Sequence, residues 1–402
     1  MRQAAIPEAL LPFAGRIVDV DTHEQVPAEL WVQEFGEIAR HWADFFINGP
    51  HDGGANHPSQ PGTVADDRPV TPDTIWKTKG PIAAGAVEPR RRLDVMDLMG
   101  VDRQQMFPTA MGGLGSFLYT YPPESRLFLK FEGDRRSYAK QLFAANNDWV
   151  IRKALFTNRL QPVPVVYGDT VEELVAVTEA LIEKGARSVL LLSAVPPGGV
   201  SPAHVALDPF YELLTRHRVV VNLHVGSEGG FLASHVWGDA PAFEGYKVAS
   251  EFSADPWNLS VMHFAPQNFT ATMIVGGVFE RHPTLRLGLH EVGAHWIGPM
   301  ADMLDHLILN ARSFGNTKTP SLSMLPSDFV RRNIRVAPFS FEPIDIYIER
   351  YGFEDVFCYS SDYPHVEGGT EPMTKFLNTI NRLGPEVVEK FFVTNGQALF
   401  PD

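Results

Sequence analysis

The stretch Phe357–Gly368 reads Phe-Cys-Tyr-Ser-Ser-Asp-Tyr-Pro-His-Val-Glu-Gly. It begins in an apolar run that predicts a buried strand over Val356–Tyr359. Pro364 cannot continue a central strand, so Asp362 stands where the strand ends and a loop begins. In parallel α/β proteins, functional side chains gather at that end of the strands. Asp362, with a histidine three residues later at position 365, is therefore a candidate metal ligand or proton acceptor. The simpler alternative is an aspartate that caps the following turn.

Seven further strand signals precede this stretch, and helical segments separate most of them. They cover residues 17–20, 103–108, 161–168, 187–192, 219–226, 285–293 and 334–339. The helical patterns cover residues 89–100, 137–158, 170–184, 209–216, 265–280 and 297–310, and two shorter ones follow at 372–383 and 385–392. Eight strands in such an alternation predict a parallel (β/α)₈ TIM barrel. A doubly wound open sheet is the competing fold, but its glycine-rich phosphate turn is absent after residues 17–20.

Composition sets the class of protein. The 402 residues are 44% hydrophobic and 20% charged, which predicts a globular chain with a large core. A net charge of -14 argues against nucleic-acid and anionic-membrane partners. Cys358 is the single cysteine, so neither an internal disulfide nor a cysteine metal cage is expected, and we interpret it as a buried, inert thiol. The sequence shows neither an apolar run of membrane-span length nor an apolar signal core, and we expect a cytoplasmic protein.

One long segment departs from the barrel pattern. Residues 32–88 are rich in glycine and proline and are long for a connection. We expect one domain over residues 1–402, in which residues 32–88 are an inserted lid or substrate loop. His51 and His57 lie in this segment, and we leave them out of the site because histidines in such loops are usually solvated.

Four potential ligands occur at the ends of three of the predicted strands. Asp21 and His23 follow the first strand, His224 the fifth and Asp362 the eighth. Residues two apart on an extended chain point the same way, so Asp21 and His23 can face one ion together. Two imidazoles and two carboxylates suit Zn²⁺, Mn²⁺ or a similar divalent ion with an open position. His290, at the end of the sixth strand, is then placed as an acid or base. The structural alternative is a set of polar strand ends with satisfied histidines.

These motifs resemble the amidohydrolase superfamily. Within this superfamily, the motifs most resemble the branch that contains aminocarboxymuconate-semialdehyde decarboxylase and the resorcylate and carboxyvanillate decarboxylases. The resemblance spans most of the chain outside the insertion and is carried by residues 17–23, 222–224, 289–293 and 360–365, and by residues 92–101 and 277–287.

The resemblance implies a distorted (β/α)₈ barrel with one divalent metal, zinc or manganese. It implies that the metal ligands are Asp21, His23, His224 and Asp362. It also implies an acid/base role for His290 or Glu291, with Asp362 sharing in proton transfer, and places Arg92 against a substrate carboxylate.

The same resemblance favours a mononuclear centre and a small-molecule substrate. Binuclear members carry a carboxylated lysine after the fourth strand, where this chain has Ser193 and Ala194. The favoured reaction is non-oxidative decarboxylation of an aromatic or unsaturated carboxylic acid. The alternative is metal-dependent hydrolysis of a lactone, an amide or a vinylogous C–C bond, and a third hypothesis is a barrel that only binds a ligand. We expect a homo-oligomer, either a dimer or a tetramer.

Overall fold

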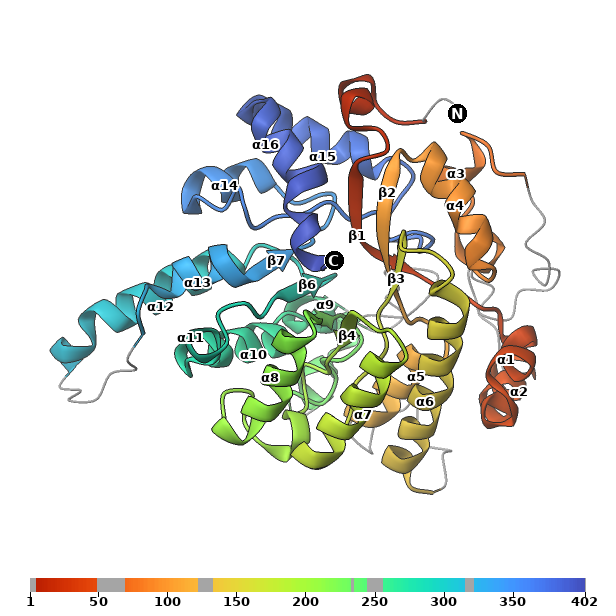
Figure 1. The fold of residues 1–402 in the computed structure, drawn as a ribbon, viewed down its shortest axis with the longest axis horizontal. Helices are drawn as coiled ribbons and strands as arrows, with labels where there is room; N and C mark the ends of the chain where they lie inside the picture. The colour runs from red at the N-terminus through yellow and green to blue at the C-terminus, as the bar shows by residue number, and fades with distance from the viewer. Residues whose placement is uncertain are drawn as a thin grey trace.

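The strands of the protein run parallel in two sheets that lie side by side (Figure 1). The computed structural model describes residues 5–48, 69–121, 133–232, 235–243, 256–314 and 322–401. One sheet has the order β1-β2-β3 and the other β4-β5-β6-β7. The strands are β1 (Ile17–His23), β2 (Val101–Phe107), β3 (Leu160–Pro162), β4 (Ser188–Leu190), β5 (Val220–His224), β6 (Leu287–His290) and β7 (Ile334–Val336).

Isolated parallel bridges join the two sheets into a closed ring. Val165 pairs with Leu190 between the β3 and β4 sides. On the other side, Val336 pairs with Phe357, and Tyr363 pairs with Thr22 of β1. The segment from Phe357 to Tyr363 thus fills the eighth position, which agrees with the predicted TIM barrel and makes it a distorted one.

The predicted eighth strand over Val356–Tyr359 is wrong in detail, because the segment forms bridges and not a continuous ladder. The amides of Cys358 and Asp362 donate to carbonyls of β7 and β1, but two amides between them have partners other than a strand carbonyl. The Tyr359 amide donates to the Phe391 carbonyl, and the Ser361 amide donates to the Asp19 carboxylate. This irregular backbone is what carries Asp362 to the barrel mouth.

Helices surround the barrel, as Figure 1 shows. The described helices are α1 (Ala28–Phe35), α2 (Arg40–Asn48), α3 (Thr74–Lys77), α4 (Pro89–Leu98), α5 (Met111–Thr120), α6 (Arg135–Ala154), α7 (Val171–Glu183), α8 (Asp208–Arg216), α9 (Pro256–Val261), α10 (Phe264–Val275), α11 (Val278–Arg281), α12 (Ile297–Asn310), α13 (Pro326–Asn333), α14 (Ile344–Tyr351), α15 (Pro372–Ile380) and α16 (Pro385–Glu389). The predicted bounds of α12 are confirmed. The single helix predicted over 265–280 is two, because Gly277 between them is left-handed with φ 74°.

The predicted insertion over residues 32–88 contains parts of α1, all of α2 and α3, and a stretch outside the described residues. His51 and His57 fall in that stretch, residues 49–68. The expectation that the segment acts as a lid therefore stays a prediction.

The C-terminal turn η12 (Gly396–Leu399) closes the end of the barrel where the strands begin. Leu399 and Phe400 belong to one buried apolar cluster with Val18 and Val20 of β1. The turn packs closely, because a Cβ at Gly396 would lie 2.8 Å from Cγ1 of Val18. Figure 1 shows the C-terminus at the centre of the ring. The functional end is the opposite one, where the strands finish.

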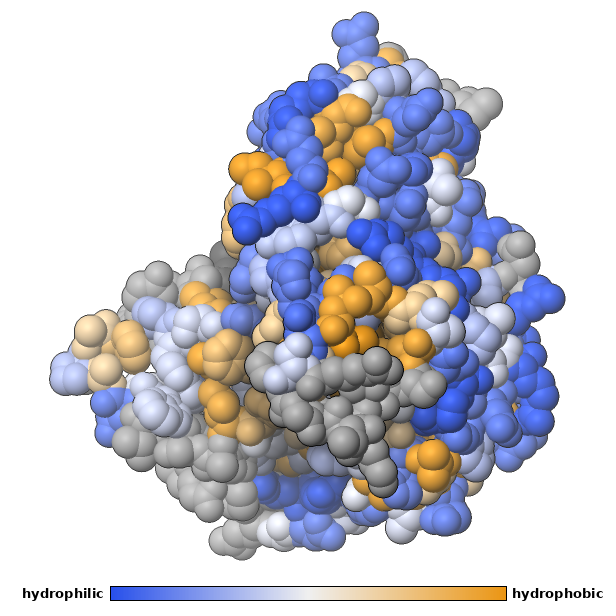
Figure 2. All heavy atoms as spheres, turned by 90° about the vertical axis from the view of Figure 1, so that its left-hand side faces the viewer, coloured by the Kyte–Doolittle hydropathy of each residue, from blue (hydrophilic) through white to orange (hydrophobic). Residues whose placement is uncertain are grey.

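Helix α12 extends away from the barrel on the left of Figure 1 and carries exposed apolar side chains. Met303, Leu307 and Leu309 are 49%, 47% and 65% exposed. Figure 2 looks at this side of the molecule and shows hydrophobic residues at the surface in patches among hydrophilic ones. None of the helices in the described part of the chain has the length and apolarity to cross a membrane.

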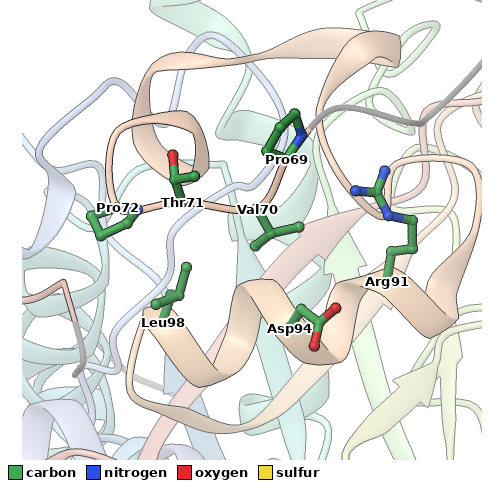
Figure 3. Close-up of a pocket in the computed structure, with 7 residues that line it drawn as sticks. All are labelled: Pro69, Val70, Thr71, Pro72, Arg91, Asp94 and Leu98. Carbon is green, nitrogen blue, oxygen red and sulfur yellow. The ribbon is translucent and has the colours of Figure 1, made fainter. Parts of the chain in front are cut away.

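A surface cleft of about 740 Å³ lies between α4 and the segment before α3 (Figure 3). Its lining consists of Pro69, Val70, Thr71, Pro72, Arg91, Asp94 and Leu98. No predicted site residue lines it, and none of its lining residues contributes a buried polar atom without a hydrogen-bond partner. Its chemistry is that of a surface groove and not of a metal site.

Candidate metal centre

Three strands deliver four of the predicted site residues to the barrel mouth. Asp21 and His23 end β1, and His224 and His290 end the paired strands β5 and β6, where they are register neighbours. Nε2 of His23 and Nε2 of His224 each lie 3.4 Å from Oδ1 of Asp21. The structure therefore brings these residues, predicted from distant parts of the sequence, into direct contact.

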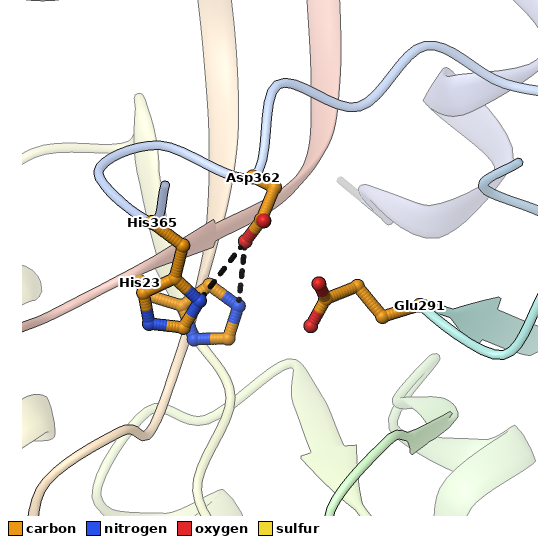
Figure 4. Close-up of side chains that lie close together, drawn as sticks. All are labelled: His23, Glu291, Asp362 and His365. Atoms are coloured by element: carbon orange, nitrogen blue, oxygen red, sulfur yellow. Dashed lines mark ion pairs between the residues drawn. The ribbon is translucent and has the colours of Figure 1, made fainter. Parts of the chain in front are cut away.

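Two loop carboxylates complete the cluster. Oδ1 of Asp362 lies 3.4 Å from Nε2 of His23, and Oε2 of Glu291 lies 3.5 Å from Nε2 of His224. Figure 4 shows both carboxylates directed toward the rings of His23 and His365, each from a different side. Asp362 and Glu291 have left-handed backbones, with φ of 52° and 51°. Non-glycine residues take this conformation at a cost of about 1 kcal/mol or more, and such strain is concentrated at functional sites.

Most of the polar atoms at the centre of the cluster have no hydrogen-bond partner among the described residues. These buried atoms are both carboxylate oxygens of Asp21 and of Asp362, Nε2 of His23 and of His224, and Nδ1 of His290. Leaving a buried polar atom unpaired costs about 1–3 kcal/mol. Because these lone pairs converge on one point, a single bound partner can satisfy them together. Ligand atoms of Asp21, His23 and His224 lie within 4.8 Å of one another. The donor set fits a single divalent metal ion.

Hydrogen bonds on the far side of the rings set which histidine nitrogens face the centre. Nδ1 of His224 lies 3.0 Å from the Val225 carbonyl, which can only accept, so Nδ1 carries the proton. This leaves the lone pair of Nε2 for the centre. Nδ1 of His23 lies 3.1 Å from Oγ1 of Thr109, which leaves its Nε2 turned to Asp21 and Asp362. Such outer hydrogen bonds are what orient metal-ligating histidines.

Burial and neighbouring charges favour the cation-binding forms of most of these groups. His224 is the exception, because burial acts to lower its pKa but the adjacent Asp21 raises it. Burial lowers the pKa of His23 to about 4 and that of His290 to about 3, so both rings are neutral at pH 7. Burial acts to raise the pKa of Asp21, but the adjacent His224 and His23 hold it below its usual range. Burial and the carboxylates of Asp362 and Asp21 raise the pKa of Glu291 well above its usual value. The cluster thus combines the neutral rings of His23 and His290, an ionised Asp21 and a Glu291 whose protonated form is favoured.

Thr109 and His365 take part in the site without being predicted as site residues. The His365 ring stacks on His23 with centroids 3.9 Å apart, and its Nδ1 lies 3.1 Å from Oδ1 of Asp362. Oγ1 of Thr109 contacts a ring nitrogen of each histidine. His365 and Glu291 belong to a second potential ligand group, together with His23 and Asp362. Thr109 follows the apolar end of β2. Its position just beyond a strand is the sequence feature that could have identified it as a site residue.

Arg92 is placed differently from its predicted role. It is fully buried, and its guanidinium donates to the backbone carbonyls of Gly85, His23 and Tyr363. It also lies over the Tyr363 ring at 4.7 Å. The neighbouring Arg91 lines the surface cleft instead (Figure 3). These contacts favour a structural role, in which Arg92 ties α4 to the loops that carry the site, and they lend no support to a substrate contact.

The chain belongs to the amidohydrolase family. The family model described as "Amidohydrolase" matches residues 130–401, which is more than half of the chain and includes His224, His290 and Asp362. This confirms the family that the sequence motifs indicate. A comparison with curated proteins finds no match.

Solved structures with the same fold cover nearly the whole chain. An amidohydrolase from Mycobacterium avium subsp. paratuberculosis K-10 is 20% identical, with a TM-score of 0.67 over 96% of this chain and 99% of its own. A 2,6-dihydroxybenzoate decarboxylase from Rhizobium is 15% identical, with a TM-score of 0.59 over 96% and 98%. A 5-carboxyvanillate decarboxylase from Novosphingobium aromaticivorans, complexed with manganese and 4-hydroxy-3-methoxy-5-nitrobenzoic acid, is 14% identical, with a TM-score of 0.57 over 100% and 99%. At these identities the likeness establishes the fold.

Proposed function

We propose that the protein is a metal-dependent non-oxidative decarboxylase of an aromatic or unsaturated carboxylic acid. The observation that carries the proposal is the set of unpaired carboxylate and imidazole atoms that converge at the barrel mouth. Two of the solved structures that share the fold are decarboxylases of hydroxylated benzoates, which supports this substrate class.

We assign the metal to Asp21, His23, His224 and Asp362. A bound zinc or manganese ion would act there as a Lewis acid that polarises substrate oxygens. Manganese is favoured by its presence in the carboxyvanillate decarboxylase structure. The residues themselves present the neutral imidazole of His23, Nε2 of His224 and the ionised carboxylate of Asp21, and the outer hydrogen bonds of Thr109 and the Val225 carbonyl hold the two rings in place.

Decarboxylation needs a proton at the carbon that carries the carboxylate. Once that carbon is protonated, the bond to the carboxylate breaks and CO₂ leaves. His290 and Glu291 are the two candidates for the proton transfer. Nδ1 of His290 has no hydrogen-bond partner among the described residues and lies 3.9 Å from Oδ2 of Asp21. Glu291 is the more accessible of the two, and burial next to other carboxylates raises its pKa, which favours the protonated form that can donate.

Hydrolysis of a neutral lactone, amide or vinylogous C–C bond is the second candidate function. It is favoured by one observation: the arginine predicted to hold a substrate anion donates to backbone carbonyls instead. In this reaction Asp362 or His290 would move the proton.

A substrate panel separates the two functions. The manganese- and zinc-loaded protein is incubated with hydroxylated benzoic acids and unsaturated diacids, and separately with neutral lactones and amides. Release of CO₂ together with the descarboxy product, absent in His224→Ala, supports the decarboxylase. Turnover of the neutral compounds without CO₂ from any acid would contradict it.

We also propose that the protein is a homo-oligomer. Helix α12 carries exposed apolar side chains, and two of them, Met303 and Leu307, are one turn apart. They give a surface suited to self-association on the side of the molecule that Figure 2 shows. Light scattering should give a mass of two or four chains, and Leu307→Glu should reduce it. A single-chain mass for the unaltered protein would contradict the proposal.

A further inference from the structure

We propose that Asn222 is a positioning residue that fixes His290 as the tautomer protonated on Nε2, so that an unprotonated Nδ1 faces the metal centre. The tautomer follows from the contacts of the amide group. Its effect on turnover rests on the proposed function, in which His290 takes part in the reaction.

The amide of Asn222 can be oriented from its partners. Its Oδ1 lies 2.9 Å from Nε2 of His290, and its Nδ2 lies 3.2 Å from the Val189 carbonyl and 2.6 Å from Oγ of Ser188. A carbonyl oxygen only accepts, so the amide atom that faces Val189 must be the NH₂ group. The oxygen of Asn222 must then face His290. Because that oxygen also only accepts, Nε2 of His290 must carry the proton.

The side-chain amide of Gln105 supports this arrangement through Ser188. Nε2 of Gln105 donates to Oγ of Ser188 at 3.0 Å and to the Leu399 carbonyl at 3.2 Å. Ser188 thus accepts from Gln105 and from Asn222 with its two lone pairs. All three of these side chains and His290 are fully buried, so water cannot substitute for a lost partner. The hydrogen bonds therefore run without interruption from the C-terminal turn to His290.

Gly288 gives independent support for the importance of this hydrogen bond. It pairs with Asn222 across β5 and β6 and lies two residues before His290. A Cβ at position 288 would lie 2.4 Å from Oδ1 of Asn222 and 2.4 Å from Nε2 of His290, the two atoms that the bond joins. The backbone of Gly288 is not left-handed, so conformation does not require glycine there. Glycine is required there because any side chain would occupy the space of the hydrogen bond between Asn222 and His290.

The choice of tautomer decides what His290 offers to the centre. Nδ1 lies 3.9 Å from Oδ2 of Asp21 and has no hydrogen-bond partner among the described residues. With the proton on Nε2, Nδ1 presents a lone pair, so in the proposed reaction His290 accepts a proton there before it passes one to the substrate carbon. With the proton on Nδ1, the ring would present a donor to Asp21 and could not accept a proton at that atom. Asn222 selects the first form.

The direct test is the nitrogen NMR spectrum of the histidine rings. The full-length, zinc-loaded protein is labelled with ¹⁵N-histidine, and the signals of His290 are assigned by their loss in His290→Gln. The expected pattern has a protonated Nε2 and an unprotonated Nδ1. A ring protonated on Nδ1, or on both nitrogens, would overturn the proposal. This measurement needs no substrate. It can therefore support or overturn the proposed tautomer even if the proposed function is wrong.

Three variants test the role in turnover. Gly288→Ala should break the hydrogen bond while both partners stay, and Asn222→Ala should remove the acceptor. We expect each to lower kcat about 10- to 100-fold, the range known for outer-shell partners, with KM and metal content unchanged. Asn222→Asp, which retains an acceptor for Nε2–H, should recover part of kcat.

Gly113→Ala in α5 is the matched control, because a Cβ there meets only the Pro108 carbonyl oxygen, at 3.9 Å. It should keep full activity. A folded Gly288→Ala or Asn222→Ala protein with lower thermal stability but unchanged kcat would show a merely structural role and overturn the proposed effect on turnover.

Discussion

Asp19 and Asp21 lie two residues apart on β1 and are equally buried, yet their surroundings are opposite. The Asp19 carboxylate accepts from the Ser361 amide at 2.9 Å, from the Ser361 hydroxyl at 2.6 Å and from Nε2 of Gln104 at 3.0 Å. Neither oxygen of Asp21 has a hydrogen-bond partner among the described residues. Burial alone therefore does not distinguish a structural carboxylate from a ligand.

The two aspartates differ in how many of their carboxylate lone pairs remain available to a bound group. Asp19 has its lone pairs in use and joins β1 to the eighth segment of the barrel. Asp21 faces three histidine rings whose inward nitrogens are also unpaired. A buried carboxylate without donors is unfavourable unless a cation completes it. We infer that the first cluster stabilises the fold and that the second binds metal.

The largest effect is expected for His224→Ala. The variant should lose the metal and its activity together while keeping its fold, because alanine cannot replace a ligand of the mouth cluster. Metal analysis and the substrate panel measure both losses. His217→Ala, which removes an exposed histidine after α8, is the control and should retain both. Retention of stoichiometric metal by His224→Ala would exclude His224 as a ligand.

The next effect is expected for His290→Asn. The metal should stay, because the four assigned ligands are intact, while kcat falls by about 10²- to 10⁴-fold if His290 moves the proton. Glu291→Gln tests the competing assignment on the same substrate. Full activity of the His290 variant combined with an inactive Glu291 variant would transfer the acid/base role to Glu291.

Arg92→Ala should act on stability more than on substrate binding. The change removes the Arg92 donor from the buried carbonyls of Gly85 and His23 and one of two donors from that of Tyr363, at a cost of about 3 kcal/mol in the free energy of unfolding. Denaturant unfolding measures the loss, and Arg91→Ala in the surface cleft is the control. A higher KM with unchanged stability would restore the predicted contact with a substrate anion.

Asp19→Ala should have the smallest effect on function. It removes the acceptor of two Ser361 donors and of Gln104, so the free energy of unfolding should fall by about 2 kcal/mol. Metal content should be unchanged, because Asp19 takes no part in the mouth cluster. Loss of metal with unchanged stability would remove the distinction between the two aspartates.

Much of the fold followed from the alternation of apolar runs and helical periods, which the parallel pairing of β1 to β7 confirms. The irregular course of the eighth segment could not be predicted, because two of its amides donate to a side chain and to a distant carbonyl. The strand ends indicated Asp21, His23, His224 and Asp362, and the structure brings them together. Arg92 illustrates the limit: the resemblance singled it out from three consecutive arginines, but only packing shows that its guanidinium donates to backbone carbonyls.

The central claim is tested most directly by the metal content of four proteins purified without chelator: the unaltered chain, Asp21→Ala, His224→Ala and Asp19→Ala. The account predicts about one divalent ion per chain in the unaltered protein and in Asp19→Ala, and a loss of most of it in the other two. An unaltered protein that holds no divalent metal even after incubation with Zn²⁺ or Mn²⁺, or equal metal content in all four, would contradict it.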